Sequence, residues 1–169
     1  MDKQGYLNMQ VASYNEEAGR WSLQSRDPVV GSYDSHNIFT DYENFLFKDF
    51  DTSNLVALEY GCGPGRNIIR FNNRFQRVDG VDISQVCIQK AHENLGHNGI
   101  KPGNLIVCDG QSIPVQDSTY DVVFSVICLQ HISCHDIRFN IFSEVNRVLK
   151  PGGRFCFQMG FGGKQRVEQ

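Results

Sequence analysis

The sequence has no apolar run that approaches the roughly 20 residues of a membrane span. Its first residues, MDKQGYLNMQ, lack the apolar stretch of a secretory signal peptide. Lysine and arginine form no cluster, and the formal net charge is only −3, so binding of nucleic-acid phosphates has little support. These absences favour a cytoplasmic protein, and we expect neither a membrane nor a nucleic acid among its partners.

Paired cysteine motifs are missing as well. The six cysteines show no CxxC spacing, and the histidines do not have the spacing of metal ligands. Cys108 and Cys156 lie in apolar runs, where cysteine behaves as a small buried hydrophobic residue. We therefore expect reduced thiols, as in a reducing compartment, and no metal site.

The chain of 169 residues is long enough for one domain with a single core. Residues 1–50 are polar with scattered aromatic side chains, and we expect a helical and loop segment that caps another part of the chain. Within it, residues 41–50 (DYENFLFKDF) place apolar side chains on one face of a short helix. These side chains are Tyr42, Phe45 and Leu46. Residues 51–169 are expected to form the core.

Apolar runs alternate with helical patterns throughout this core. Strands are predicted at residues 55–60, 77–82, 104–108, 120–126 and 154–159. Helices are predicted at about residues 66–74, 84–96 and 136–149, the second opened by Ser84 as N-cap. Strands that alternate with helices imply right-handed crossovers. The predicted fold class is α/β, a Rossmann-like, doubly wound, mainly parallel sheet of about five strands with an N-terminal helical cap.

The first strand runs directly into a turn with three glycines, Gly61, Gly63 and Gly65. Without Cβ atoms such a turn can adopt positive φ and let a ligand lie against the backbone. A tight strand-to-helix turn without a ligand is the simpler alternative. Three glycines at alternate positions of one junction favour a nucleotide-cofactor loop.

Glu59, at the end of the first strand, narrows the choice of ligand. Dinucleotide sites favour G-x-G-x-x-G/A, whereas the spacing here is G-C-G-P-G. A carboxylate at this place would repel a pyrophosphate and attract a cationic group. These observations favour a nucleoside that carries a cation over a nicotinamide dinucleotide.

Two further acidic residues follow the next strands. Asp82 could accept hydrogen bonds from both ribose hydroxyls, or it could cap the helix that starts at Ser84. Asp109 could accept from the amine of adenine, or it could form a turn with Gly110. The carboxyl ends of parallel strands share the edge where open α/β sheets bind ligands. We therefore expect the acidic side chains to contribute to one site.

The motifs LEYGCGPGRN, VDGVDIS, LIVCDGQSIPVQDSTYDVVFSVICLQHI and EVNRVLKPGG resemble the successive motifs of class I S-adenosylmethionine-dependent methyltransferases, in particular the branch that acts on small molecules. The resemblance covers about residues 55–159. It implies S-adenosylmethionine as cofactor, S-adenosylhomocysteine as product, and transfer of a methyl group to a small-molecule acceptor.

The resemblance also implies roles for individual residues. Glu59 and the glycine turn would hold the methionine part of the cofactor, and Asp82 would hold the ribose, with Ile83 beside it in the cofactor site. The adenine would contact three successive residues, Asp109, Gly110 and Gln111. Val126, after the fourth strand, would line the pocket towards the sulfonium.

No catalytic residue can be assigned from the sequence. Methyl transfer depends mainly on alignment of nucleophile, methyl group and sulfur, and a general base contributes less. His131 is the one base candidate that the sequence places near the methyl group, but a packing role is favoured for it. A cofactor-binding domain without methyl-transfer activity therefore remains the alternative, and a nicotinamide-dependent dehydrogenase is a weaker one.

The family sheet has seven strands, whereas this sequence ends soon after the fifth predicted strand. That strand, RFCFQMGF, would leave an apolar sheet edge, which proteins usually cover or pair. We expect a fragment of a longer protein, a homodimer that pairs along the edge, or shielding by the N-terminal segment. The first of these is favoured.

Overall fold

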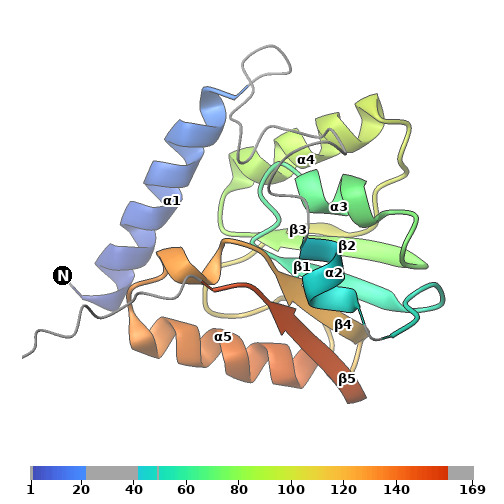
Figure 1. The fold of residues 1–169 in the computed structure, drawn as a ribbon. Coiled ribbons are helices and arrows are strands. Elements are labelled where there is room, and N and C mark those ends of the chain that lie inside the picture. Colours follow the sequence, from blue (N-terminus) through green and yellow to red (C-terminus); the bar gives the residue numbers. More distant parts are fainter. Residues whose placement is uncertain (1, 22–41, 49, 160–169) are drawn as a thin grey trace, which may run out of the picture.

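The computed structural model describes residues 2–21, 42–48 and 50–159 (Figure 1). Its centre is a sheet with the strand order β3-β2-β1-β4-β5, in which every neighbouring pair is parallel. The strands are β1 (Val56–Tyr60), β2 (Arg77–Asp82), β3 (Leu105–Val107), β4 (Tyr120–Ser125) and β5 (Leu149–Phe157). The predicted five-stranded, Rossmann-like α/β fold is thereby confirmed.

Helices cover both faces of this sheet (Figure 1). They are α1 (Lys3–Gly19), α2 (Tyr42–Phe47), α3 (Arg66–Phe71), α4 (Gln85–His97) and α5 (His135–Val148), with a single 3₁₀ turn, η1, at Leu129–His131. Side chains of α2, α3 and α4 join one buried apolar cluster, and side chains of α1 and α5 join a second. Helix α1 also packs against α4, beside the carboxyl ends of the central strands.

The predicted boundaries in the core agree closely with the structure. β2 spans the predicted residues, and β1, β3 and β4 are shorter than predicted by one or two residues. Ser84 caps α4 as expected, because its hydroxyl accepts from the backbone N–H of Cys87 at 3.0 Å. Helix α3 is shorter than predicted and ends at Phe71.

β5 begins earlier than the sequence indicates. Lys150, Pro151 and the two following glycines suggest a helix stop before a strand at Arg154, whereas β5 starts at Leu149. Leu149 pairs with Tyr120, but the next pair joins Arg154 to Val122, so the intervening residues bulge out of the ladder. The breaker residues therefore lie in an irregular part of the strand.

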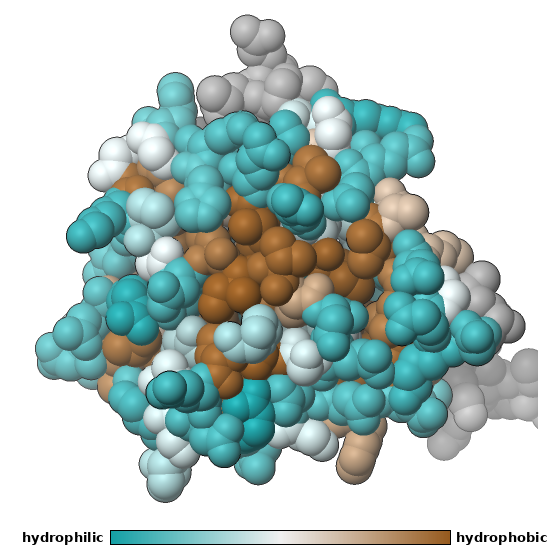
Figure 2. Space-filling view, turned by 180° about the vertical axis from the view of Figure 1, so that it is seen from behind, coloured by the Kyte–Doolittle hydropathy of each residue, from teal (hydrophilic) through white to brown (hydrophobic). Residues whose placement is uncertain are grey.

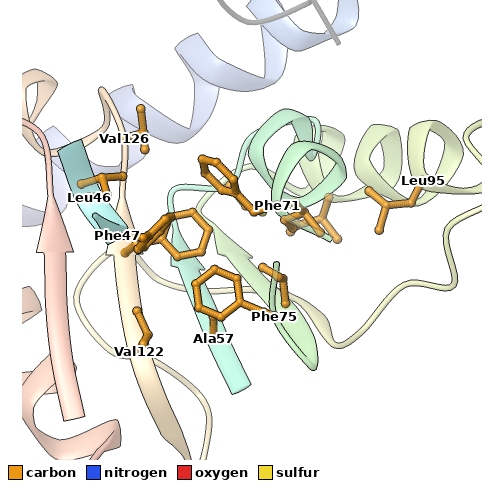
Figure 3. Close-up of a cluster of buried hydrophobic side chains, with 13 residues drawn as sticks. Leu46, Phe47, Ala57, Phe71, Phe75, Leu95, Val122 and Val126 are labelled. Carbon is orange, nitrogen blue, oxygen red and sulfur yellow. The ribbon is translucent and has the colours of Figure 1, made fainter. Parts of the chain in front are cut away.

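One of the two cores is rich in aromatic side chains (Figure 3). Phe47 of α2 is fully buried and meets Phe71, Phe75 and Phe124 edge-to-face, with ring centroids 5.2–5.5 Å apart. The expected apolar face of this helix was wrong at Phe45, which is 70% exposed, whereas Leu46 is buried as expected and Phe47 is buried beside it. The side chain of the third expected member, Tyr42, lies outside the described residues. Phe47 is therefore the side chain by which this short helix packs into the core.

The apolar residues of the N-terminal helix α1 follow a helical pattern, although the sequence analysis predicted no bounds for a helix there. Leu7, Val11, Tyr14 and Ala18 recur at the spacing of one helix face, and Leu7 and Ala18 are buried. Asp2 caps the helix by accepting from the backbone N–H of Gly5 at 2.7 Å. These local signals explain why the segment is helical.

Apolar side chains also reach the surface. Seen from the side opposite to Figure 1, a hydrophobic patch lies within a mainly hydrophilic surface (Figure 2). On α5 and β5, Phe139 is 70% exposed and Phe142 and Phe157 are each 38% exposed. Among the described strands, β5 pairs only with β4, so its other edge is open. No helix in the described ranges is long and apolar enough to cross a membrane.

Candidate functional site

A cavity of about 440 Å³ lies at the carboxyl ends of β1, β2 and β4. Its floor comes from these strand ends and from the turn between β1 and α3, and α1 forms one wall. The strand order reverses between β1 and β4, and this is the place where open α/β sheets bind ligands. The volume is that of a site for a small molecule.

The glycine turn has the backbone that the sequence predicts. Gly61, Gly63 and Gly65 have φ values of +74°, +51° and +84°. A Cβ on Gly61 would come within 2.3 Å of Cys128 Sγ, so only glycine lets these two segments approach. Gly61 and Gly63 line the cavity and present bare backbone to it.

Glu59, the last but one residue of β1, lies in the cavity wall and is 1% exposed. Its Oε1 accepts from Asn67 Nδ2 at 2.7 Å, whereas its Oε2 has no partner among the described residues. Burial raises the pKa of this carboxyl to about 8, against the opposing effects of Asn67 and Arg66. A buried acceptor without a partner is costly, and a cationic ligand would satisfy it.

Asp82 also lies in the cavity wall but is fully engaged with the backbone. Its Oδ2 accepts from the N–H of Gly63 at 2.8 Å, and its Oδ1 accepts from the N–H of Ser84 at 2.8 Å. Burial raises the pKa of Asp82, and these backbone hydrogen bonds oppose the effect. Ser84, not Asp82, caps α4. Each carboxylate oxygen keeps a second lone pair, so the ribose hydroxyls of a nucleoside still have acceptors here.

Three residues of the predicted cofactor site lie outside the cavity wall. A Cβ on Gly65 would meet Leu95 at 2.7 Å, so this glycine serves the close packing of α3 on α4. Asp109 is exposed, and its Oδ1 accepts from the backbone N–H groups of Gln111 and Ser112. This is the turn geometry that the sequence left open as an alternative. Gln111 faces Asn140 of α5, whose Nδ2 lies 3.4 Å from its Oε1.

Three other predicted residues do line the cavity, namely Ile83, Gly110 and Val126. Ile127 follows Val126 with φ +63°, a conformation that is strained for a β-branched residue. Its N–H donates to Gln158 Oε1 at 3.0 Å, which ties the loop after β4 to the end of β5. The sequence carried no signal for this strained residue.

A helical cap from residues 1–50 was expected, but the sequence analysis did not name the α1 side chains that form this wall of the site. Tyr6, Gln10, Tyr14 and Glu17 face the cavity, all from one side of the helix. Burial raises the pKa of the Tyr14 hydroxyl to about 12. The helical spacing of the aromatic residues was the signal that could have found this wall.

Polar contacts tie α1 to the rest of the domain at several places. Tyr6 Oη accepts from the N–H of Ser133 at 3.0 Å. Asn15 Oδ1 accepts from Oγ of Ser84, two residues after Asp82, at 2.6 Å. Lys90 Nζ donates to the backbone carbonyl of Trp21 at 2.6 Å. The helix is thereby held over the cavity along its length.

The other chemically reactive groups in the wall are His131 and several thiols. His131 closes the turn η1 and is exposed, and its backbone carbonyl accepts from Tyr6 Oη at 3.2 Å. Burial raises the pKa of Cys62 and Cys128 well above the usual thiol value. These thiols are therefore protonated at neutral pH and poor nucleophiles. All six cysteines are free.

The profile of the family described as "Methyltransferase domain" matches residues 57–153, which is more than half of the chain. The chain belongs to the class I S-adenosylmethionine-dependent methyltransferases. The family predicted from the sequence motifs is confirmed, and the dehydrogenase alternative is excluded. The match spans the methyltransferase sheet from β1 into β5 and includes the glycine turn and the loop after β4.

Curated relatives of this methyltransferase domain act on different acceptors. The chain is 30% identical over 105 residues to "Sterol 4-C-methyltransferase strm-1" of Caenorhabditis elegans, which covers 62% of the chain and 30% of the relative. It is 26% identical over 166 residues to "Phosphoethanolamine N-methyltransferase 2" of the same organism, covering 96% of the chain and 35% of the relative. The chain thus spans about a third of the length of these two relatives.

Solved methyltransferase structures share the fold. The PH0226 protein of Pyrococcus horikoshii superposes with a TM-score of 0.68 at 27% identity, over 79% of this chain and 63% of that one. Phosphoethanolamine N-methyltransferase 2 of Haemonchus contortus in complex with S-adenosyl-L-methionine gives a TM-score of 0.60 at 28% identity, over 72% and 27%. The fold of the methyltransferase family is therefore present in the described residues.

Proposed function

We propose that this domain binds S-adenosylmethionine in the cavity at the ends of β1, β2 and β4 and transfers the methyl group to a small-molecule acceptor. One observation carries the proposal: Glu59 Oε2 is a buried acceptor without a partner in the described residues, beside a glycine turn that leaves the backbone open. The cofactor carries an ammonium group that fits such an acceptor. Family membership supplies the reaction class.

The residues of the proposed site take separate parts of the cofactor. Glu59, Gly61 and Gly63 hold the methionine end, and Asp82 with Ile83 holds the ribose. Their positions in the cavity wall support these assignments. Val126 lies towards the sulfonium.

The adenine end of the proposed site lies after β3. Gly110 lines the cavity, whereas Asp109 and Gln111 follow β3 just outside its wall. We assign Asp109 and Gln111 to the adenine end of the proposed site, and Gly65 to the turn that shapes the site. Loss of affinity in Asp109→Ala, with the thermal unfolding unchanged, would support this assignment.

When bound, the cofactor supplies a methyl group on a good leaving sulfur, so the protein's task is alignment. Orientation in a near-attack geometry contributes on the order of 7–11 kcal/mol to such a displacement. The α1 wall excludes water from one side of the cavity, and the strained Ile127 fixes the loop after β4. His131 is the base candidate at the cavity, and its replacement by alanine tests that role through the pH profile of turnover.

The acceptor class follows from the cavity's lining and from the family. Leu7, Ile127, Ile132 and Ile137 give the cavity an apolar side, next to Tyr6. Relatives named for sterol and phosphoethanolamine acceptors support a small molecule. The alternative is a domain that binds the cofactor without transferring its methyl group.

Calorimetry with S-adenosylhomocysteine tests the binding proposal directly. We expect one site per chain with an affinity in the micromolar range, as for typical enzyme ligands. Folded protein that takes up no S-adenosylhomocysteine would contradict the proposal. Incubation with radiolabelled cofactor and a panel of small acceptors then separates the enzyme from a domain that only binds.

We also propose a cytoplasmic location and a homodimer that pairs along the open edge of β5. Six free thiols support a reducing compartment. Exposed Phe139, Phe142 and Phe157 beside the open edge support a partner there. Sedimentation analysis should show a dimer that Phe139→Ser with Phe157→Ser converts to a monomer, and a monomeric wild type would refute the pairing.

A further inference from the structure

Three buried side chains at one end of the cavity have polar atoms without a partner among the described residues. They are Glu59 Oε2 at the end of β1, and Arg66 Nη1 and Asn67 Oδ1 at the start of α3. The three residues are 1%, 8% and 7% exposed, and all of them line the cavity. Orphaned polar atoms of this kind are rare in folded proteins, and a group of three needs an explanation.

The donors and acceptors of this group are complementary to one kind of ligand. Glu59 Oε2 and Asn67 Oδ1 are acceptors, which an ammonium group with three donors satisfies. Asn67 is held in position because its Nδ2 donates to Glu59 Oε1 at 2.7 Å. Arg66 Nη1 is a charged donor, and a planar guanidinium fits a carboxylate. A ligand with an ammonium and a carboxylate on one carbon satisfies all three atoms.

Resting on the proposed function, we propose that Arg66 binds the carboxylate of the cofactor's amino-acid end while Glu59 and Asn67 bind its ammonium. These three side chains then recognise a zwitterion rather than a simple cation. Arg66 Nη1 is a buried donor without a partner among the described residues, and the ligand carboxylate provides that partner.

Among the described arginines, Arg20 precedes Trp21 of the cavity wall in the chain, and its own contacts argue against a role in binding the carboxylate. Its side chain is 74% exposed, and it forms an ion pair with Glu16 one turn earlier on α1. Arg20 is not part of the cavity wall. It carries the same charge as Arg66 and therefore provides a matched control.

The test compares two ligands that differ in one group. S-adenosylhomocysteine has both the ammonium and the carboxylate, whereas its decarboxylated analogue keeps only the amine. The wild type should bind S-adenosylhomocysteine about 10- to 100-fold more tightly than the analogue, the scale of one charge-assisted contact. In Arg66→Gln this preference should fall below about threefold, with the affinity for the analogue unchanged. Arg20→Gln should keep the full preference.

Several outcomes would overturn the assignment. An equal loss of affinity for both ligands in Arg66→Gln means that Arg66 only supports the fold. An unchanged preference means that a group other than Arg66 binds the carboxylate of the ligand. If the wild type binds neither ligand, the proposed function fails before the role of Arg66 is reached.

A second variant and a stability measurement keep the assignment testable. Ligand-free Arg66→Gln should unfold at the same urea concentration as the wild type or a higher one, because a buried donor without a partner is removed. If this variant does not fold, Arg66→Lys should show a reduced preference, since an ammonium cannot form the bidentate pair. A full preference in folded Arg66→Lys would contradict the proposed contact.

Discussion

Glu59 and Asp82 are buried carboxylates at the ends of neighbouring strands, and they differ in what the protein itself offers them. Both oxygens of Asp82 accept backbone N–H groups, from Gly63 and from Ser84. Glu59 has one side-chain partner, Asn67, and one oxygen with no partner in the described part of the chain. Asp82 therefore organises the glycine turn whether or not a ligand is bound, whereas Glu59 is complete only with a ligand.

This difference separates two ways of building a binding site. A carboxylate that the backbone already satisfies contributes both to stability and to binding, so its loss should reduce both. A carboxylate that the fold leaves unsatisfied contributes to binding and lowers the stability of the ligand-free protein. Substitutions at the two positions should therefore move affinity in the same direction and stability in opposite directions.

Asp82→Ala should have the largest effect. We expect S-adenosylhomocysteine to bind about 100-fold more weakly, the scale of two lost hydrogen bonds to a charged group, and the free energy of unfolding to fall by about 2 kcal/mol. Calorimetry and urea denaturation measure the two effects. Asp51→Ala removes an exposed aspartate that accepts from the backbone and side chain of Ser53, away from the cavity, and should change neither. If Asp82→Ala loses affinity but keeps the wild-type free energy of unfolding, Asp82 contributes to binding alone and does not differ from Glu59 in this respect.

Glu59→Gln should weaken binding by about 10- to 30-fold, because the ammonium loses its charged acceptor. Its effect on stability should depend on pH. The pKa of Glu59 is raised from 4.5 to about 8, so the folded protein holds this proton more tightly than the unfolded chain. The wild type therefore loses stability as the pH rises from 4.5 to about 8, and the variant lacks this loss. Urea denaturation across this range should show profiles that diverge; parallel profiles would contradict the prediction.

The affinity of the wild type should itself rise with pH. Ammonium binding favours the ionised form of Glu59, so binding below pH 8 requires release of a proton. Between about pH 6 and about pH 7.5 the affinity should increase about 25-fold, in a site where Arg66 and Asp82 are the neighbouring charges. Calorimetry in buffers of different ionisation enthalpy measures the released proton. Glu59→Gln should release none, and a proton released by that variant would assign the effect to another group.

Asn15→Ala should have the smallest effect, because it acts on the site through Ser84. Loss of the Asn15 contact removes one link between α1 and the cap of α4, beside Asp82. We expect about threefold faster release of S-adenosylhomocysteine, the scale of one neutral hydrogen bond. Stopped-flow fluorescence measures this rate. Asn8→Ala, on the same helix but exposed and bonded to Gln4, is the control and should leave it unchanged.

The core of the fold could be predicted because its signals are local. Alternating apolar patterns and Ser84 as a cap located β2 and α4 almost to the residue. The buried face of α2 and the start of β5 were predicted wrongly, because the environment of each is distant in the sequence. Phe47 is buried among aromatic rings from α3, β4 and the segment before β2, and β5 extends back through Pro151 because β4 lies alongside.

The sequence predicts the residues at the floor of the candidate site, at the strand ends and the glycine turn, but not the side chains of its walls. Glu59, Gly61, Gly63 and Asp82 lie at strand ends, and topology alone brings them to one edge of a parallel sheet. Asp109 ends a strand in the same way, yet its carboxylate closes a local turn outside the cavity wall. A shared strand end therefore predicts proximity but not the direction of a side chain.

Sequence patterns were sufficient to predict the family, the sheet and the glycine turn. Local spacing shows the period of the apolar residues, the glycines that allow positive φ and the positions of the charged residues. The tertiary structure was needed to find which polar atoms remain without partners, since partners come from residues far apart in the chain. In the sequence, Glu59 and Asp82 are both acidic residues at the ends of strands. Only packing gives both oxygens of Asp82 a backbone partner and leaves Glu59 Oε2 without a partner among the described residues. The same packing buries Arg66 beside Glu59 and lays α1 over both strand ends.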